Sequence, residues 1–106
     1  MYWVVDYKCT AEASSSISYD DAEFYLNLAV VPAATKEEAI QRLEKNLSRD
    51  KITITDIRDI SEYSSYDTEL KDAFQLKDAY DEAVHDHDVV TALFIPSNLL
   101  EHMGIK

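Results

Sequence analysis

The stretch "AVVPAATKEEAIQRLEKNL" at residues 29–47, which leads into "ITITDIRDISEY" at 52–63, decides the fold. Pro32 ends an apolar strand, and a helical pattern follows it. Alternation at Ile52 and Ile54 then predicts another strand, and the later change of apolar spacing predicts a bulge or bend within it. The two segments therefore form a strand–helix–strand unit.

The helix of this unit has a recognisable start. Thr35 and Glu38 have the spacing of a capping box, in which each side chain satisfies the other residue's free backbone N–H. Glu38 and Arg42, four residues apart, can also pair along the helix surface. The helix is predicted over about 36–49. Its apolar stripe consists of Ala39, Ile40, Leu43 and Leu47.

Four further elements complete the chain. Alternation over 2–9 and 23–32 predicts two strands of a hairpin, with a long polar loop between them. Asp67 can cap a second helix that continues to about 84. The predicted buried side of this helix consists of Leu70, Ala73, Phe74, Leu76, Tyr80, Ala83 and Val84. The run "VVTALFI" at 89–95 is apolar on both faces, as expected of a central strand covered on both sides or of a strand next to a parallel neighbour.

The resulting order is β-β-α-β-α-β. The length of 106 residues suits a single domain, residues 1–106, around one hydrophobic core. In the strand–helix–strand unit the two strands run in the same direction, which favours a mixed sheet. The predicted fold class is α+β: a two-layer sandwich with a four-stranded mixed sheet and both helices on one face.

The chain is strongly acidic, with 21 Asp and Glu against 10 Lys and Arg and a formal net charge of −11. Residues 56–88 carry most of the excess. Phosphate backbones and anionic membranes repel such a surface, so neither is expected as a ligand, and a basic protein partner is favoured. Cys9 is the only cysteine, and no apolar run approaches the ~20 residues of a membrane span, so a cytoplasmic protein is expected.

The residues with catalytic potential lack a catalytic context. Gly104 is the only glycine, which excludes the glycine-rich loops that hold phosphates and dinucleotides. The serine run at 14–16 has no nucleophile motif around it. In "HDHD" at 85–88, residues two apart on a helix point away from each other, so a helix end is predicted rather than a metal site. No catalytic residue, metal or cofactor is therefore expected.

The segment "SEYSSYDTELKDAFQLKDAYDEAVHD" at 61–86 is the most informative for function. Tyr63 and Tyr66 precede the acidic helix, and tyrosines beside serines are efficient contact residues. Like charges three or four residues apart, as at Asp78, Asp81 and Glu82, destabilise a helix. Two interpretations carry equal weight: a binding face for a basic protein, or tyrosines that cover the sheet edge beside solvated acids.

The strand–helix–strand unit at 29–63 and the acidic, tyrosine-bearing segment after it resemble the immunity proteins of contact-dependent growth inhibition and related polymorphic toxin systems. Those proteins are small, acidic, single-domain and cytosolic. The resemblance implies a non-enzymatic inhibitor that binds its cognate toxin one to one. The toxin is often a nuclease with a basic groove, in which acidic side chains replace substrate phosphates.

The expected contacts with the toxin are Tyr63, Tyr66, Asp67, Asp72, Asp78, Asp81, Glu82 and Asp86. In this interpretation the tyrosines anchor the complex and the acids steer it. Three alternatives remain. An acidic nucleic-acid mimic would bind many basic proteins, and a regulatory subunit would form a stable homo-oligomer. A metal-dependent enzyme using residues 85–88 is the least favoured.

Overall fold

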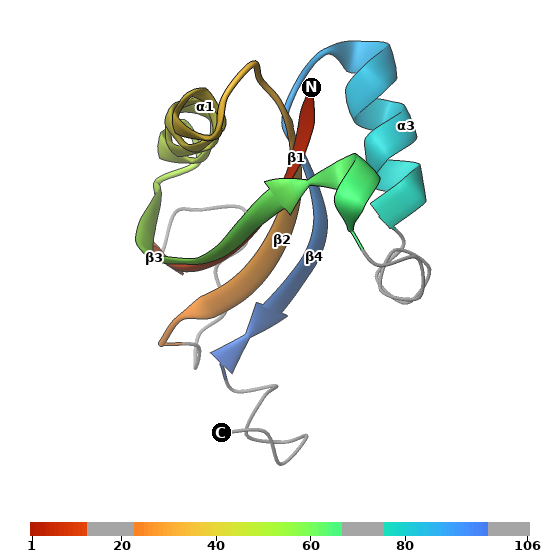
Figure 1. The fold of residues 1–106 in the computed structure, drawn as a ribbon. Helices are drawn as coiled ribbons and strands as arrows, with labels where there is room; N and C mark the ends of the chain where they lie inside the picture. Colours follow the sequence, from red (N-terminus) through yellow and green to blue (C-terminus); the bar gives the residue numbers. More distant parts are fainter. Residues whose placement is uncertain (13–22, 67–75, 98–106) are drawn as a thin grey trace.

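The computed structural model describes residues 1–12, 23–66 and 76–97 (Figure 1). In chain order its elements are β1 (Tyr2–Ala11), β2 (Tyr25–Pro32), α1 (Lys36–Ser48), β3 (Ile52–Glu62), the 3₁₀ helix η1 (Tyr63–Ser65), α3 (Leu76–Asp86) and β4 (Val90–Pro96). The α+β class and the order of strands and helices agree with the sequence prediction, and η1 is an addition to it.

The sheet is antiparallel throughout its described strands, so the prediction of a mixed sheet was wrong. Its spatial order is β3-β1-β2-β4. β1 pairs antiparallel with β2 on one side and with β3 on the other, and β4 pairs antiparallel with β2. β2 and β3 therefore run in the same direction, as a strand–helix–strand unit requires, but β1 lies between them and separates the parallel pair.

The two helices lie on opposite faces of the sheet, and Figure 1 shows the sheet between α1 and α3. The predicted two-layer sandwich with both helices on one face was therefore wrong. The physical reason is in β1, where Val4 is 1% exposed and its neighbour Val5 is 0% exposed. Adjacent residues of a strand point to opposite faces, so both faces of this sheet need a cover.

Each helix forms its own core with the sheet. The core beneath α1 contains Trp3, Val5, Tyr7, Cys9, Tyr25, Ala29, Val31, Ala33, Ala39, Leu43, Leu47 and Ile52. The core beneath α3 contains Val4, Leu28, Val30, Leu76, Ala79 and Ala83. The alternation predicted for the first two strands is confirmed, but it sorts residues between two cores rather than between core and solvent.

The start of α1 is confirmed in most of its detail. The Thr35 hydroxyl accepts a hydrogen bond from the backbone N–H of Glu38 at 3.1 Å. The Glu38 carboxylate accepts the N–H of Ala34 at 3.3 Å, one residue before the expected partner. Arg42 donates to the carbonyl oxygen of Pro32, which ties the helix to the end of β2 instead of forming the predicted pair with Glu38.

Removing this cap is expected to cost stability without changing the fold. Thr35→Ala leaves the Glu38 N–H without its side-chain acceptor, which should lower the free energy of unfolding by about 1 kcal/mol. Urea denaturation followed by circular dichroism measures the loss. Thr35→Ser keeps the hydroxyl and is the matched control. Equal losses in both variants would show that the hydroxyl hydrogen bond is not the stabilising feature.

Two bulges in β3 confirm the irregularity predicted from its isoleucine spacing. The register between β1 and β3 shifts between Asp6 and Tyr7 and again between Lys8 and Cys9. At each shift β3 contains one extra residue. Each extra residue restores the apolar phase, so Ile54, Ile57 and Ile60 all pack against the core beneath α1.

Among the described strands β4 lies at the edge of the sheet and has no parallel neighbour, so neither predicted position of this strand is observed there. In the described part of the chain it pairs with β2 alone. Its Val90 and Ala92 pack against the core beneath α3. The apolar sequence of β4 therefore does not report its place in the strand order.

Candidate functional site

The outer side of α3 is acidic. Its exposed residues are Lys77, Asp78, Asp81, Glu82, Val84, His85 and Asp86. The buried side is formed by Leu76, Ala79 and Ala83, whose spacing is helical. Val84 was predicted to be buried, but its side chain is 38% exposed. Ala79, which was not among the predicted buried residues, is buried instead. The longer acidic side chains lie on the exposed side of the helix.

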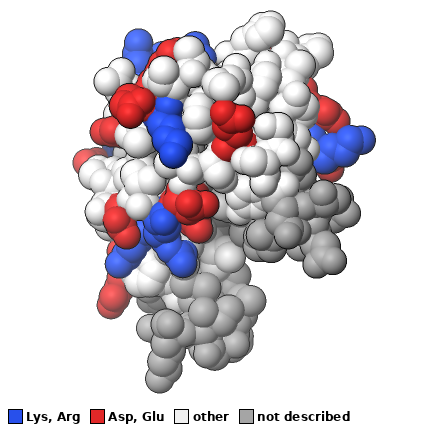
Figure 2. Space-filling model, in the orientation of Figure 1, with Lys and Arg blue, Asp and Glu red and all other residues white. Residues whose placement is uncertain are grey.

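Only part of this arrangement favours helix stability, because Asp78 lies in the first turn of α3, where the helix dipole stabilises a carboxylate. Asp78 is three residues from Asp81 and four from Glu82, and each such pair of like charges costs about 0.2–0.5 kcal/mol. Lys77 is the only lysine or arginine of α3. Over α1 and β3, at the left of Figure 2, acidic and basic side chains are interleaved. The excess of one sign on α3 therefore differs from the charge pattern on that part of the surface.

Three tyrosines attach α3 to the end of the sheet, and we call Tyr2, Tyr63 and Tyr80 the tyrosine cluster. The Tyr63 ring stacks on the Tyr80 ring with centroids 4.1 Å apart and an angle of 11° between their planes. Tyr2 meets Tyr80 edge to face, with centroids 5.0 Å apart. All three side chains are half-buried and pack against the core beneath α3. Aromatic pairs in these geometries add stability beyond the area that they bury.

The tyrosine cluster borders a hollow of about 190 Å³ that is also lined by Met1, Glu62 and Ser64. The Tyr63 ring packs against the core beneath α3, which agrees with the interpretation that it covers the sheet, and it also lines a surface hollow. Tyr80 was missed as a site residue. Helical spacing placed it on the buried side of its helix, and its pairing with Tyr63 depends on which face of the sheet α3 covers.

Tyr66 lies at a different hollow from Tyr63. This second hollow, of about 170 Å³, is lined by Asp6, Leu26, Asn27, Leu28, Arg58, Tyr66 and Ile95. Burial raises the pKa of Tyr66, and the negative charges of Asp6 and Asp59 raise it further. Arg58 lies 3.9 Å from the Asp6 carboxylate. The two predicted tyrosine anchors therefore line different hollows, although both pack against the core beneath α3.

The remaining predicted contacts divide into two groups. Asp78, Asp81, Glu82 and Asp86 share α3 with Tyr80, whose ring stacks on the ring of Tyr63. The predicted contacts at Asp67 and Asp72 lie outside the described residues. The acidic helix and the tyrosine cluster thus form the part of the candidate face that the structure brings together.

The "HDHD" segment is the end of a helix, as predicted. His85 and Asp86 belong to the last turn of α3, and the N–H of His87 donates to the carbonyl oxygen of Ala83 at 2.8 Å. Asp86 Oδ1 lies 2.8 Å from His85 Nδ1, and this hydrogen bond, together with the carboxylate charge, raises the pKa of His85 above its usual 6.5. The exposed Asp86 is thus partly compensated at the negative end of the helix dipole.

His87 has a backbone φ of 54°, a left-handed conformation that glycine adopts without steric cost. His87→Gly is expected to raise the free energy of unfolding by about 0.5–1 kcal/mol, because relief of the Cβ clash outweighs the added entropy of the unfolded chain. Urea denaturation measures the gain. His85→Gly, inside α3, is the control and should lose about 1 kcal/mol. A lower free energy of unfolding in both variants would contradict a steric cost of the left-handed backbone at His87.

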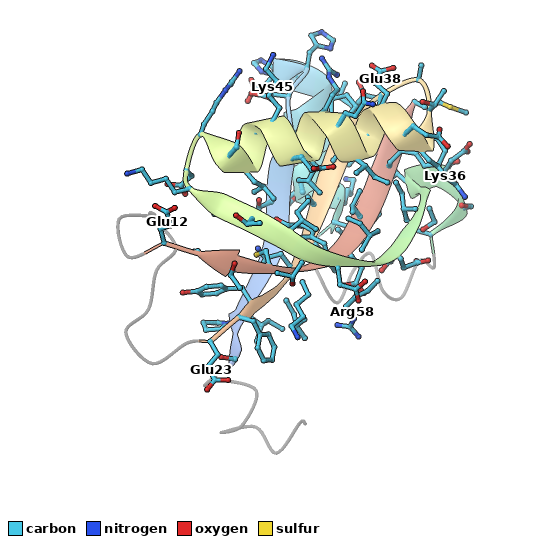
Figure 3. All side chains as sticks on the ribbon, turned by 90° about the vertical axis from the view of Figure 1, so that its left-hand side faces the viewer. Glu12, Glu23, Lys36, Glu38, Lys45 and Arg58 are labelled. Atoms are coloured by element: carbon cyan, nitrogen blue, oxygen red, sulfur yellow. The ribbon has the colours of Figure 1, made fainter. Side chains whose placement is uncertain are left out.

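Basic side chains gather at the C-terminal half of α1. A hollow of about 150 Å³ there is lined by Arg42, Lys45, Asn46, Arg49, Asp88 and Val89. Figure 3 shows Lys45 toward the opposite end of α1 from Lys36. Positive charge at this end stabilises the helix dipole, so the cluster has a structural explanation.

Within residues 1–12, 23–66 and 76–97, no group of three or more His, Cys, Asp or Glu side chains is arranged to hold a metal ion. In the same ranges no helix is long and apolar enough to cross a membrane. Comparison of the chain with protein-family models, with curated proteins and with solved structures finds no match in any of the three. The candidate site therefore rests on its own geometry and charge.

Proposed function

We propose that this protein is an immunity protein, a cytoplasmic inhibitor that binds one secreted toxin domain one to one and blocks its action. The observation that carries the proposal is the acidic outer side of α3, which keeps destabilising like charges while the tyrosine cluster fixes the helix to the sheet. Stability alone does not explain this concentration of charge, whereas recognition of a basic surface does.

The proposed mechanism is occupation of a basic groove. Asp78, Asp81, Glu82 and Asp86 are exposed on one helix. Such a row of carboxylates steers a positively charged protein during encounter and can take the places of substrate phosphates in its groove. The stacked Tyr63 and Tyr80 rings hold the helix in one position, so little conformational entropy is lost on binding.

Calorimetric titration tests the proposal. The protein is titrated with the purified toxin domain encoded immediately upstream of it, at two salt concentrations. Tight one-to-one binding that weakens as salt rises is the expected result. No heat of binding to that domain would contradict the proposal. Equal binding to unrelated basic proteins, such as lysozyme, would instead identify an acidic nucleic-acid mimic.

A further inference from the structure

The two edges of the sheet differ in how they resist pairing with another strand. The β3 edge contains two bulges relative to β1. It also exposes the charged residues Asp56, Arg58 and Asp59. Bulges and charges are the usual means by which natural proteins prevent a free edge from pairing with a further strand. The β3 edge is therefore protected.

The β4 edge lacks most of that protection. Val90–Pro96 contains no charged residue and has one register shift against β2. In the described part of the chain β4 pairs with β2 alone. An apolar strand with one unpaired side exposes backbone N–H and C=O groups to which an extended chain can bind.

The charge beside this edge indicates what kind of chain fits it. A hollow of about 140 Å³ lies between α3 and the first half of β4, and its lining consists of Asp78, Ala79, Glu82, Val90, Thr91 and Ala92. Figure 1 shows α3 beside this part of β4. Asp78 and Glu82 thus place two exposed carboxylates next to the side of β4 that has no strand partner among the described residues.

We propose that the β4 edge accepts an extended, basic segment of the partner as an added strand. This inference rests on the proposed function, because it describes how a basic toxin domain would be held. Asp78 and Glu82 are four residues apart, about 6 Å along a helix axis. Alternate residues of a strand lie about 7 Å apart on one face. Two lysines or arginines separated by one residue therefore match the two carboxylates.

The same charges disfavour a second copy of this chain as the occupant. An antiparallel pair of β4 edges about a twofold axis perpendicular to the sheet would place both α3 helices on one face of the joined sheet. Two acidic helices would then lie on the same face close to the junction, and such like charges oppose association. Charge complementarity thus selects a basic partner over self-association.

A blocked octapeptide of alternating lysine and valine is the probe, added at millimolar concentration and low salt. We expect amide hydrogen exchange, measured by NMR, to slow at least tenfold at alternate residues of β4 and to stay unchanged in β3.

The double variant Asp78→Asn with Glu82→Gln should weaken binding of the lysine–valine peptide about tenfold. Glu37→Gln with Glu44→Gln changes the net charge equally on α1 and should leave binding unchanged. A glutamate–valine octapeptide should not bind.

Three results would overturn the inference: no peptide binding, peptide binding without protection of β4, or protection of β4 in a dimer formed without peptide. Two further results distinguish failure of the added strand from failure of the proposed immunity function. Binding of the toxin domain with β4 unprotected would keep the immunity role and reject the added strand. Peptide binding that protects β4, together with no binding of the toxin domain, would keep the added strand for a different basic partner.

Discussion

Truncation of Leu43 to alanine is expected to lower the free energy of unfolding by about 3 kcal/mol, and truncation of Leu76 by a similar amount. Both side chains are 0% exposed, so each truncation removes buried methyl groups and leaves a cavity. A domain of this size has a stability of about 5–15 kcal/mol, so either loss is a large part of the total. Urea denaturation at equilibrium measures both.

The single tryptophan distinguishes the two cores. Trp3 is 6% exposed in the core beneath α1, and its indole N–H donates to the carbonyl oxygen of Ala33 at 3.1 Å. Leu43→Ala should therefore shift the native fluorescence emission, whereas Leu76→Ala, on the other face of the sheet, should not. Val84→Ala, at an exposed position of α3, should change stability by less than about 0.5 kcal/mol. Equal emission shifts in both leucine variants would contradict two separate cores.

The local elements were predictable because their signals lie within short windows of sequence. The Thr35 cap and the apolar period after it located α1, and alternation located the first two strands. The irregular spacing of Ile54, Ile57 and Ile60 also indicated the β3 bulges correctly. Each of these features depends on residues that are neighbours in the chain.

The arrangement of the elements was less predictable. The run "LAVV" at 28–31 is apolar at consecutive positions, which is the pattern of a strand covered on both faces. Its alternation alone predicts a strand with one face on a core, whereas the consecutive apolar positions indicate a helix on each face. The position of β4 at the edge had no comparable signal, because periodicity reports which faces are buried and not which strands pair.

The candidate face shows the same limit. The exposed acids of α3 followed from helical spacing, but the stacking of Tyr63 on Tyr80 joins residues from separate elements. Their contact depends on α3 covering the β1 face that carries Tyr2 and Val4. Tyr63 and Tyr66 were predicted as a pair of anchors because only two serines separate them in sequence. After η1, Tyr66 lines a hollow with Asp6 and Arg58, and Tyr63 lines a different one.

Neutralising Asp78, Asp81 and Glu82 together, with asparagine at the first two and glutamine at the third, is expected to slow association with the toxin domain at least tenfold at low salt. Electrostatic steering acts mainly on the association rate, so the dissociation rate should change less. The dependence of the association rate on salt should also flatten, because fewer charge interactions remain to be screened. Stopped-flow mixing at several salt concentrations measures these effects.

The matched control neutralises three exposed carboxylates on other elements: Glu12→Gln, Glu37→Gln and Glu44→Gln. Both triple variants have the same net charge, so a difference between them isolates the position of the charge from its total. If only the α3 variant associates slowly, the acidic face of α3 guides the encounter. Equal slowing in both would attribute steering to the overall charge of −11. Unchanged rates in both would remove the acidic face from the proposed function.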